Sequence, residues 1–200
     1  LLTYVIAAVV IRFPEWFTVL MVVTVLLMLS AKPGIRRFSD AFRAVEMVTL
    51  AYRTQGLLLS PGNPKGIHSI MDLTQKNVKF INRNPGPGTR LWLDREIHRL
   101  GLTPDSIRGY MDFVHTHSES ALTIQSGRAD AALGIQAAAH QHGLDFIPLF
   151  EERYDLVIPD EQLKKLKPIL DTLQTKSFRR EVEGLHGYDT KHTGEEIPIY

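Results

Sequence analysis

The distribution of apolar residues divides the chain into two unlike parts. Residues 1–11 are nearly all apolar, and residues 16–31 form a second apolar run without a charged side chain. From about Val45 onward, short apolar runs alternate with amphipathic stretches and with connections rich in glycine and proline. The pattern therefore predicts an apolar N-terminal segment over residues 1–44 and a globular domain over residues 45–200.

The globular part shows two kinds of apolar periodicity in turn. Short alternating or continuous apolar runs predict strands at residues 45–52, 56–60, 77–82, 111–115, 129–135, 145–149 and 154–158. Apolar spacings of three and four residues, with start and stop signals, predict helices at residues 69–73, 89–100, 116–127, 136–143 and 161–185. Such alternation is typical of an α/β fold with a largely parallel sheet.

Two of the predicted helices begin with residues that favour helix starts. Thr89 is the expected N-cap of a helix that carries Leu93 and Ile97 on one face. Thr116 and Glu119 have the spacing of a capping box, in which each side chain accepts a backbone hydrogen bond from the other residue. Both helices therefore follow a predicted strand after a short polar connection.

The uncharged run over residues 16–31 has three interpretations. It is shorter than the roughly 20 apolar residues of a spanning helix, although Trp16 and the basic residues beyond Ala31 suit a membrane anchor. Small residues near Ala31 also suit the cleavage site of a signal peptide. The third interpretation is a buried part of the α/β core, because valines are frequent in the run. An anchor or signal would place the protein at a membrane or in the periplasm; otherwise we expect it in the cytoplasm.

The sharpest candidate for ligand chemistry is the loop between the predicted strand 77–82 and the helix after it. Its sequence is Arg83-Asn84-Pro85-Gly86-Pro87-Gly88. Glycine lets a ligand approach the backbone, and the free N–H groups of a helix start favour negative charge. Arg83 and Arg90 lie on either side of the loop and could donate to an oxyanion. The alternative is a tight connection with solvated arginines.

A second segment, Thr116-His117-Ser118-Glu119-Ser120, has the same logic at another helix start. Its hydroxyls and backbone amides could complete an anion site, or they could do no more than cap the helix. Ligands of open α/β sheets collect at the carboxyl ends of the strands, and both segments would lie there. This shared location favours the two segments together as one site for a small anion.

Composition argues against several classes of function. The chain has 200 residues and no cysteine, which excludes disulfides, thiolate ligands and a cysteine nucleophile. Lys and Arg number 23 against 22 Asp and Glu, so direct nucleic-acid binding by this chain is not expected. His115 and His117 would share one face of a strand, but no carboxylate pattern supports a metal there. No nucleophile elbow or phosphate loop is present, and we expect neither catalysis nor a cofactor.

Several stretches in a fixed order give the chain a family resemblance. They are Ala51-Tyr52-Arg53-Thr54-Gln55-Gly56-Leu57, Pro61-Gly62-Asn63-Pro64-Lys65-Gly66, Asn82-Arg83, Gly88-Thr89-Arg90, Gly127-Arg128-Ala129-Asp130-Ala131, Glu152-Arg153-Tyr154-Asp155-Leu156, Gly187-Tyr188-Asp189-Thr190 and Thr193-Gly194-Glu195. With them, residues from about 45 to 199 resemble the periplasmic-binding-protein-like domain of molybdate-responsive regulators. That domain is often fused to a helix-turn-helix segment or to molybdopterin-biosynthesis modules.

The resemblance implies a two-lobed α/β fold, with mostly parallel sheets, that closes on a small ligand. It implies that Gly88-Thr89-Arg90 contacts an oxyanion, with Arg83 beside it, and that residues 116–118 (Thr116, His117 and Ser118) form the wall of the second lobe. It places Tyr154 where the chain crosses back toward the first lobe, so that Tyr154 touches the ligand or the hinge. The implied function is the binding or sensing of an oxyanion such as molybdate or tungstate.

The sequence departs from the family pattern at two places. Pro87 stands where relatives usually have serine, which removes a hydroxyl and an N–H donor from the loop. Residues 1–44 lack the glycine- and serine-containing loop with which relatives begin their first lobe, so that lobe is expected to be incomplete. Three roles stay open: the ligand-sensing part of a transcriptional regulator, a membrane-tethered component of an anion uptake system, and a truncated remnant that does not bind.

Overall fold

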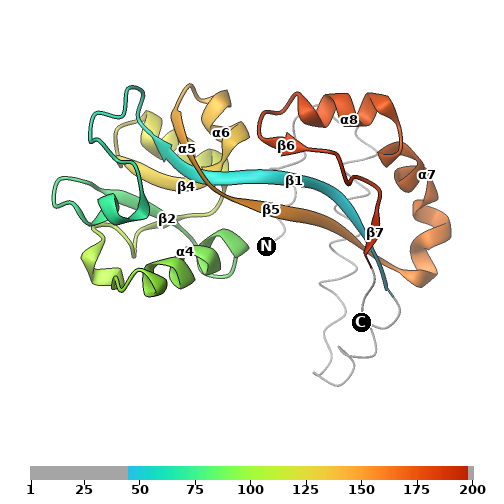
Figure 1. Ribbon diagram of the computed structural model, residues 1–200, viewed down its shortest axis with the longest axis horizontal. Helices are drawn as coiled ribbons and strands as arrows, with labels where there is room; N and C mark the ends of the chain where they lie inside the picture. Colours follow the sequence, from blue (N-terminus) through green and yellow to red (C-terminus); the bar gives the residue numbers. More distant parts are fainter. Residues whose placement is uncertain (1–44, 198–200) are drawn as a thin grey trace, which may run out of the picture. The chain divides into compact units, whose positions relative to one another are not determined.

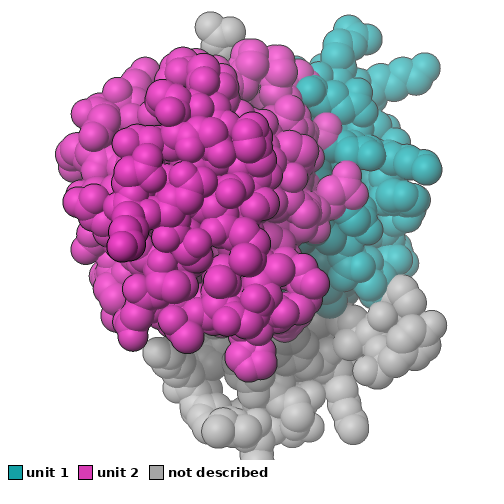
Figure 2. All heavy atoms as spheres, turned by 60° about the vertical axis from the view of Figure 1, so that its left-hand side comes forward, with its two compact units in different colours: residues 1–52, 153–183, 189–200 teal, residues 53–152, 184–188 magenta. Residues whose placement is uncertain are grey.

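The computed structural model describes residues 45–197, which form a mixed α/β fold of two compact units (Figures 1 and 2). Unit 2 holds residues 53–152 and 184–188. Of the described residues, unit 1 holds 45–52, 153–183 and 189–197. Two long strands, β1 (Val45–Leu59) and β5 (Asp145–Pro159), each contribute residues to both units.

Unit 2 is built around a mostly parallel sheet. The path of neighbouring strands is β3 (Phe113–Val114), β2 (Phe80–Arg83), β4 (Ala131–Ile135), β1 and β5. Strand β2 runs parallel to both β3 and β4, whereas β1 pairs antiparallel with β4. The structure therefore confirms the predicted α/β class with a mostly parallel sheet, and it adds one antiparallel neighbour at β1.

Helices cover both faces of this sheet, and the central strands β2 and β4 are buried along their whole length. Alternate residues of β1 enter different cores: Leu57 and Leu59 pack in one cluster, and Leu58 packs in the other. The first cluster contains the apolar face of α4 (Gly88–Arg99) and the 3-10 turn η2 (Ile70–Thr74). The second contains α5 (His117–Gln125) and α6 (Gln136–Gln141), on the opposite face of the sheet (Figure 1).

Strand β1 is continuous where the sequence pattern predicts two strands. The polar residues Arg53 to Gln55 interrupt the apolar pattern but continue the strand, because backbone pairing and not apolar side chains holds this part of the ladder. Strand β5 likewise includes the charged residues 151–153 that separate the two predicted strands. Gly56 permits the close approach of β5, since a Cβ there would lie 2.0 Å from the carbonyl oxygen of Ile147.

Unit 1 combines the other parts of the long strands with two helices. The start of β1 pairs antiparallel with β7 (Glu196–Ile197), and β6 (Tyr188–Asp189) also pairs with β1. The amphipathic helix α7 (Leu163–Leu173) packs Leu166 and Ile169 against Ile158 of β5. The 3-10 turn η4 (Asp160–Gln162) precedes α7, and helix α8 (Lys176–Glu183) follows it. A further 3-10 turn, η3 (Pro104–Ser106), lies between α4 and β3 in the sequence.

Several predicted bounds differ from the structure by a few residues. Helix α4 begins at Gly88 with Pro87 as its N-cap, so the prediction that Thr89 is the N-cap is wrong. Residues 111–112 and 115 lie outside β3, and the predicted strand at 77–82 begins at Phe80. The predicted membrane or signal segment at 16–31 and the question of an incomplete first lobe both concern residues outside the described range. Within residues 45–197, no helix has the length and apolar character needed to cross a bilayer.

Candidate functional site

The two segments predicted to bind an anion lie at one edge of the unit 2 sheet. Strand β2 ends at Arg83 and leads to α4, and β3 ends at Val114 and leads to α5. The two strands are parallel, with Arg83 opposite Val114, so both connections leave the same edge of the sheet. This is the carboxyl edge, where open α/β sheets collect their ligands.

The first turn of α4 has no side-chain cap among the described residues. Its N-cap, Pro87, has neither a hydroxyl nor a carboxylate to accept from the backbone N–H groups. The hydroxyl of the buried Thr89 points instead to β1 and donates to Oε1 of Gln55 at 2.7 Å. Of the two helix starts at this edge, the start of α4 is therefore the one whose backbone N–H groups and helix dipole favour the binding of an anion.

The carboxylate of Glu152 lies beside this helix start. Oε2 of Glu152, on β5, accepts from Nε of Arg53 at 2.6 Å and from Nε2 of Gln55 at 2.5 Å, and it forms an ion pair with Nη2 of Arg53 at 2.6 Å. Its other oxygen, Oε1, faces Gly88, since a Cβ at Gly88 would lie 3.2 Å from it. Glu152, Arg53, Gln55 and Thr89 thus form one hydrogen-bonded network that ends at the first turn of α4.

The start of α5, by contrast, is capped by its own side chains. The hydroxyl of Thr116 accepts from the backbone N–H of Glu119 at 3.0 Å, as the capping box predicts. The carboxylate of Glu119 accepts from the backbone N–H of His115 at 2.6 Å, one residue earlier than the capping box requires. Ser118 lies half-buried in the first turn. The backbone donors of α5 are therefore used mainly within the chain.

Arg83 joins the end of β2 to the start of α5. Its guanidinium donates through Nη1 to Nδ1 of His117 at 2.8 Å and through Nη2 to the carbonyl oxygen of His115 at 2.9 Å. Because a guanidinium only donates, Nδ1 of His117 is the acceptor and the ring proton is on Nε2. Burial lowers the pKa of His117 well below 6.5, and the positive charges of Arg83 and Arg53 lower this pKa further. His117 is thus a neutral donor within a positive environment.

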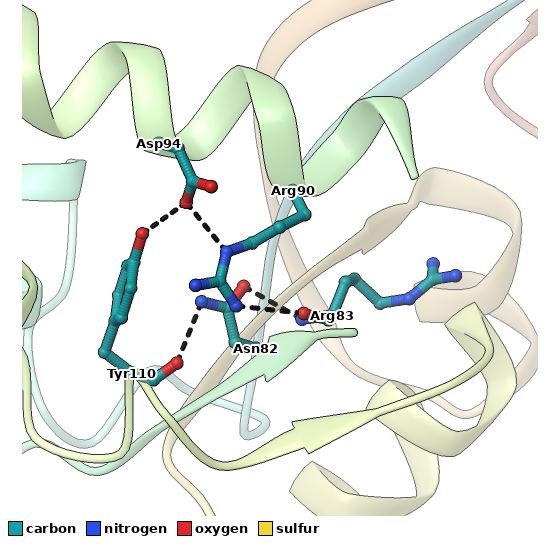
Figure 3. Close-up of polar contacts among 5 residues, drawn as sticks. All are labelled: Asn82, Arg83, Arg90, Asp94 and Tyr110. Carbon is teal, nitrogen blue, oxygen red and sulfur yellow. Dashed lines mark hydrogen bonds and ion pairs between the residues drawn. The ribbon is translucent and has the colours of Figure 1, made fainter. Parts of the chain in front are cut away.

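Arg90 is held in the interior of unit 2 by several contacts (Figure 3). Its Nε donates to Asp94 at 2.7 Å, its Nη1 donates to the carbonyl oxygen of Arg83 at 3.2 Å, and its guanidinium lies 4.4 Å from the ring centroid of Tyr110. The hydroxyl of Tyr110 also donates to Asp94. Burial, and then this hydrogen bond, raise the pKa of Tyr110. These contacts fix α4 to the end of β2.

The structure places most of the predicted ligand residues at one edge of the unit 2 sheet. Arg83, Gly88 and Thr89 lie on the α4 side of the edge, and residues 116–118 lie on the α5 side. Tyr154 lies half-buried on β5, in the part of that strand that belongs to unit 1. His115 and His117 do not share a strand face, because His115 follows β3 and His117 opens α5. No group of three or more metal-ligating side chains occurs within residues 45–197.

Three polar residues of the network were not predicted as ligand residues: Arg53, Gln55 and Glu152. Each stands within a stretch that carries the family resemblance, but no local motif distinguishes it from a surface residue of a strand. The sequence offered one signal, since Gln55 stands next to the apolar run of residues 56–59. The structure shows that Gln55 is as fully buried as Leu57 and Leu58. A buried glutamine needs hydrogen-bond partners, and it therefore marks a polar network inside the sheet.

The arrangement of strands, covering helices and polar connections at the carboxyl edge is that of a solute-binding α/β domain. Residues 33 to 174 match the family model described as a PBP superfamily domain, and the chain belongs to this periplasmic-binding-protein-like family. This membership confirms the predicted family.

Two bacterial proteins are similar to this chain in sequence. YvgK of Bacillus subtilis (strain 168) is 38% identical over 151 residues, which cover 76% of this chain and 49% of YvgK. A protein encoded in the 5′ region of the ferredoxin 2Fe-2S gene of Clostridium pasteurianum is 42% identical over 106 residues, covering 52% of this chain and 94% of that protein. The chain therefore spans about half the length of YvgK.

Solved structures share the fold at low sequence identity. PEB3 with L-phospholactate bound has a TM-score of 0.55 and 16% identity, over 72% of this chain and 68% of PEB3; PEB3 comes from Campylobacter jejuni. The substrate-binding domain of a molybdenum ABC transporter from Clostridium difficile has a TM-score of 0.51 and 17% identity, over 76% of this chain and 67% of that domain. At these identities the similarity establishes the fold alone.

Proposed function

We propose that this solute-binding domain binds a small oxyanion of the molybdate and tungstate class at the carboxyl edge of the unit 2 sheet. One observation carries the proposal: two nitrogens of Arg53 and the amide nitrogen of Gln55 lie within 2.6 Å of a single carboxylate oxygen beside the uncapped start of α4. An oxyanion of a ligand presents the same kind of oxygen to the same donors. Gly88 and Thr89 provide the adjoining first turn of the helix.

The charge of the neighbouring groups supports an anionic ligand. Arg53 and Arg83 are cationic, and their charges both act on His117. Since His117 is kept neutral with its proton on Nε2, it can donate to an oxygen without adding a third charge. The α5 side of the edge, with Arg83 and residues 116–118, therefore supports the site mainly through its positive charge and through the neutral His117. Arg90 supports α4 from behind, through Asp94 and Tyr110.

Known ligands of proteins with this fold are compatible with the proposal. PEB3 binds L-phospholactate, which carries a phosphate and a carboxylate, and the Clostridium difficile domain belongs to a molybdenum transporter. Because these similarities establish only the fold, the ligand class of this chain is proposed from its own donors. The mechanism is a shift of population toward the state that holds the anion, without catalysis.

The transporter neighbour favours a second role beside ligand sensing in a transcriptional regulator. In that role the domain is the binding component of an anion uptake system. A regulator would act in the cytoplasm, whereas an uptake component would be attached to the membrane or lie in the periplasm. The two roles require the same site and differ in the partner to which ligand binding is transmitted.

Thermal unfolding of the 200-residue chain with molybdate, tungstate, sulfate and phosphate tests the proposal. A ligand of the native state adds about 2.7 kcal/mol to the free energy of unfolding at a hundredfold excess over Kd. We expect the rise with molybdate or tungstate to be largest, and we expect Arg53→Gln to reduce it without removing it. Arg95→Gln, at an exposed position of α4, is the matched control and should keep the rise. A cooperative transition that no anion shifts would refute oxyanion binding.

A further inference from the structure

Glu152 occupies the donors that the proposed ligand requires. Its Oε2 takes the N–H groups of Arg53 and Gln55, and its Oε1 lies at the first turn of α4 beside Gly88. We infer that Glu152 is an internal carboxylate that competes with the ligand for these donors and sets which anions the site accepts. This inference rests on the proposed function and concerns the selectivity of the same site.

The geometry of the ion pair allows such an exchange. Both contacting nitrogens of Arg53 share the single oxygen Oε2, so the pair lacks the two parallel bonds of a fork-to-fork arginine–carboxylate pair. The side chains of Arg53 and Glu152 are 12% and 25% exposed, so that water reaches the carboxylate. This water can solvate the carboxylate when it separates from Arg53, which lowers the cost of breaking the pair. Glu152 can therefore leave Arg53 when a stronger anion arrives.

Selectivity follows from the charge of the competing groups. When a singly charged carboxylate displaces Glu152, one carboxylate replaces another, so the interaction energy with Arg53 and Gln55 changes little. A tetrahedral dianion brings twice the charge, and it has enough oxygens to reach the donors of β1 and the first turn of α4 together. With Glu152 present, the site should accept dianions such as molybdate and sulfate and should reject acetate and formate.

Calorimetric titration of the wild-type chain and of Glu152→Gln with molybdate, sulfate and acetate tests this inference. Glutamine keeps the size of the side chain but removes its charge, so we expect molybdate to bind about tenfold more tightly to the variant. We also expect acetate binding to become measurable in the variant. Glu151→Gln removes the same charge from an exposed neighbour on β5, and its molybdate affinity should stay within about twofold of the wild type.

The double variant Arg53→Gln/Glu152→Gln separates competition from a general charge effect. If Glu152 acts by occupying Arg53, the gain of Glu152→Gln should vanish when Arg53 is also replaced. If Glu152→Gln does not unfold cooperatively, Glu152→Ala replaces it, and we expect the same tighter binding of molybdate in that variant. Equal or weaker molybdate binding in a folded Glu152 variant, with binding retained in the wild type, would overturn the inference and leave the proposed function standing. Absence of binding in both proteins would overturn both.

Discussion

Helices α4 and α5 both begin one connection after a parallel strand of the same sheet, yet their first turns are completed in different ways. Helix α5 is capped by Thr116 and Glu119, which accept from backbone N–H groups of residues 119 and 115. Helix α4 begins after a proline, lacks a side-chain cap, and has Glu152 of β5 beside its first residue. Local sequence completes the start of α5, whereas a residue distant in the sequence lies at the start of α4.

The comparison shows how a helix start that can bind a ligand differs from one that is only part of the structure. A cap that is three residues away in sequence forms as the helix forms and leaves few backbone donors for anything else. A helix start without a local cap, with only a carboxylate of another element beside it, keeps its backbone donors open to a ligand. We therefore assign binding to the α4 side and support to the α5 side, where Arg83 links His115 and His117 to β2.

The largest expected effect concerns the support of α4. Arg90→Ala removes the ion pair with Asp94, the hydrogen bond to the carbonyl oxygen of Arg83 and the contact with the Tyr110 ring. We expect a loss of about 2 kcal/mol in the free energy of unfolding, since Arg90 is buried while Asp94 is partly exposed. Urea unfolding followed by circular dichroism measures the loss. Arg95→Ala, on the exposed face of α4, should change stability by less than about 0.5 kcal/mol. Equal losses in the two variants would contradict a supporting role for Arg90.

A smaller effect concerns the α5 side and depends on pH. The folded-state pKa of His117 is lowered, so the unfolded chain binds a proton that the folded chain excludes. Stability from this group is complete above the unfolded pKa of about 6.5 and falls by about 1.4 kcal/mol per pH unit below it, until the folded pKa is reached. We expect His117→Gln, which keeps an acceptor for Arg83 but cannot titrate, to lose less stability between pH 6.5 and 5.5 than the wild type. Parallel pH profiles of the two proteins would show that His117 does not titrate in this way.

Much of the fold follows from apolar periodicity in the sequence. Leu93 and Ile97 predicted a helix with one buried face, and both lie in the core that α4 shares with the sheet. The predicted breaks within β1 and β5 were wrong for a physical reason. Charged residues such as Glu152 and Arg153 interrupt an apolar pattern, but a strand continues as long as its backbone groups are paired with neighbouring strands.

The site was predictable only as far as it is local in the sequence. Arg83 and Gly88 were recognisable because glycine, proline and arginine stand together between a strand and a helix. The contacts of Glu152 join residues separated by 99 and 97 positions, to Arg53 and Gln55 respectively. No spacing rule connects such residues, and their juxtaposition depends on the pairing of β1 with β5. The ion pair of Arg90 with Asp94 follows from their i,i+4 spacing on one helix, but the contact of Arg90 with Tyr110 was inaccessible because it forms only in the folded core.

The smallest expected change in stability comes from giving α4 the kind of cap that α5 has. Pro87→Asp places a carboxylate at the N-cap, which favours the helix, but it also removes the rigidity of proline. These contributions are each roughly 1 kcal/mol and opposite in sign, so stability should change by less than about 0.5 kcal/mol.

Anion binding should nevertheless respond to this cap, because the new carboxylate occupies the donors of the first turn. We expect the molybdate affinity of Pro87→Asp to fall about tenfold in calorimetric titration. Pro85→Asp adds the same charge at an exposed position two residues earlier, outside the helix, and should cause a much smaller fall. An unchanged affinity in Pro87→Asp would mean that the start of α4 does not hold the ligand. In that case the difference between the two helix starts would be structural alone, and binding would have to be assigned to the α5 side of the edge.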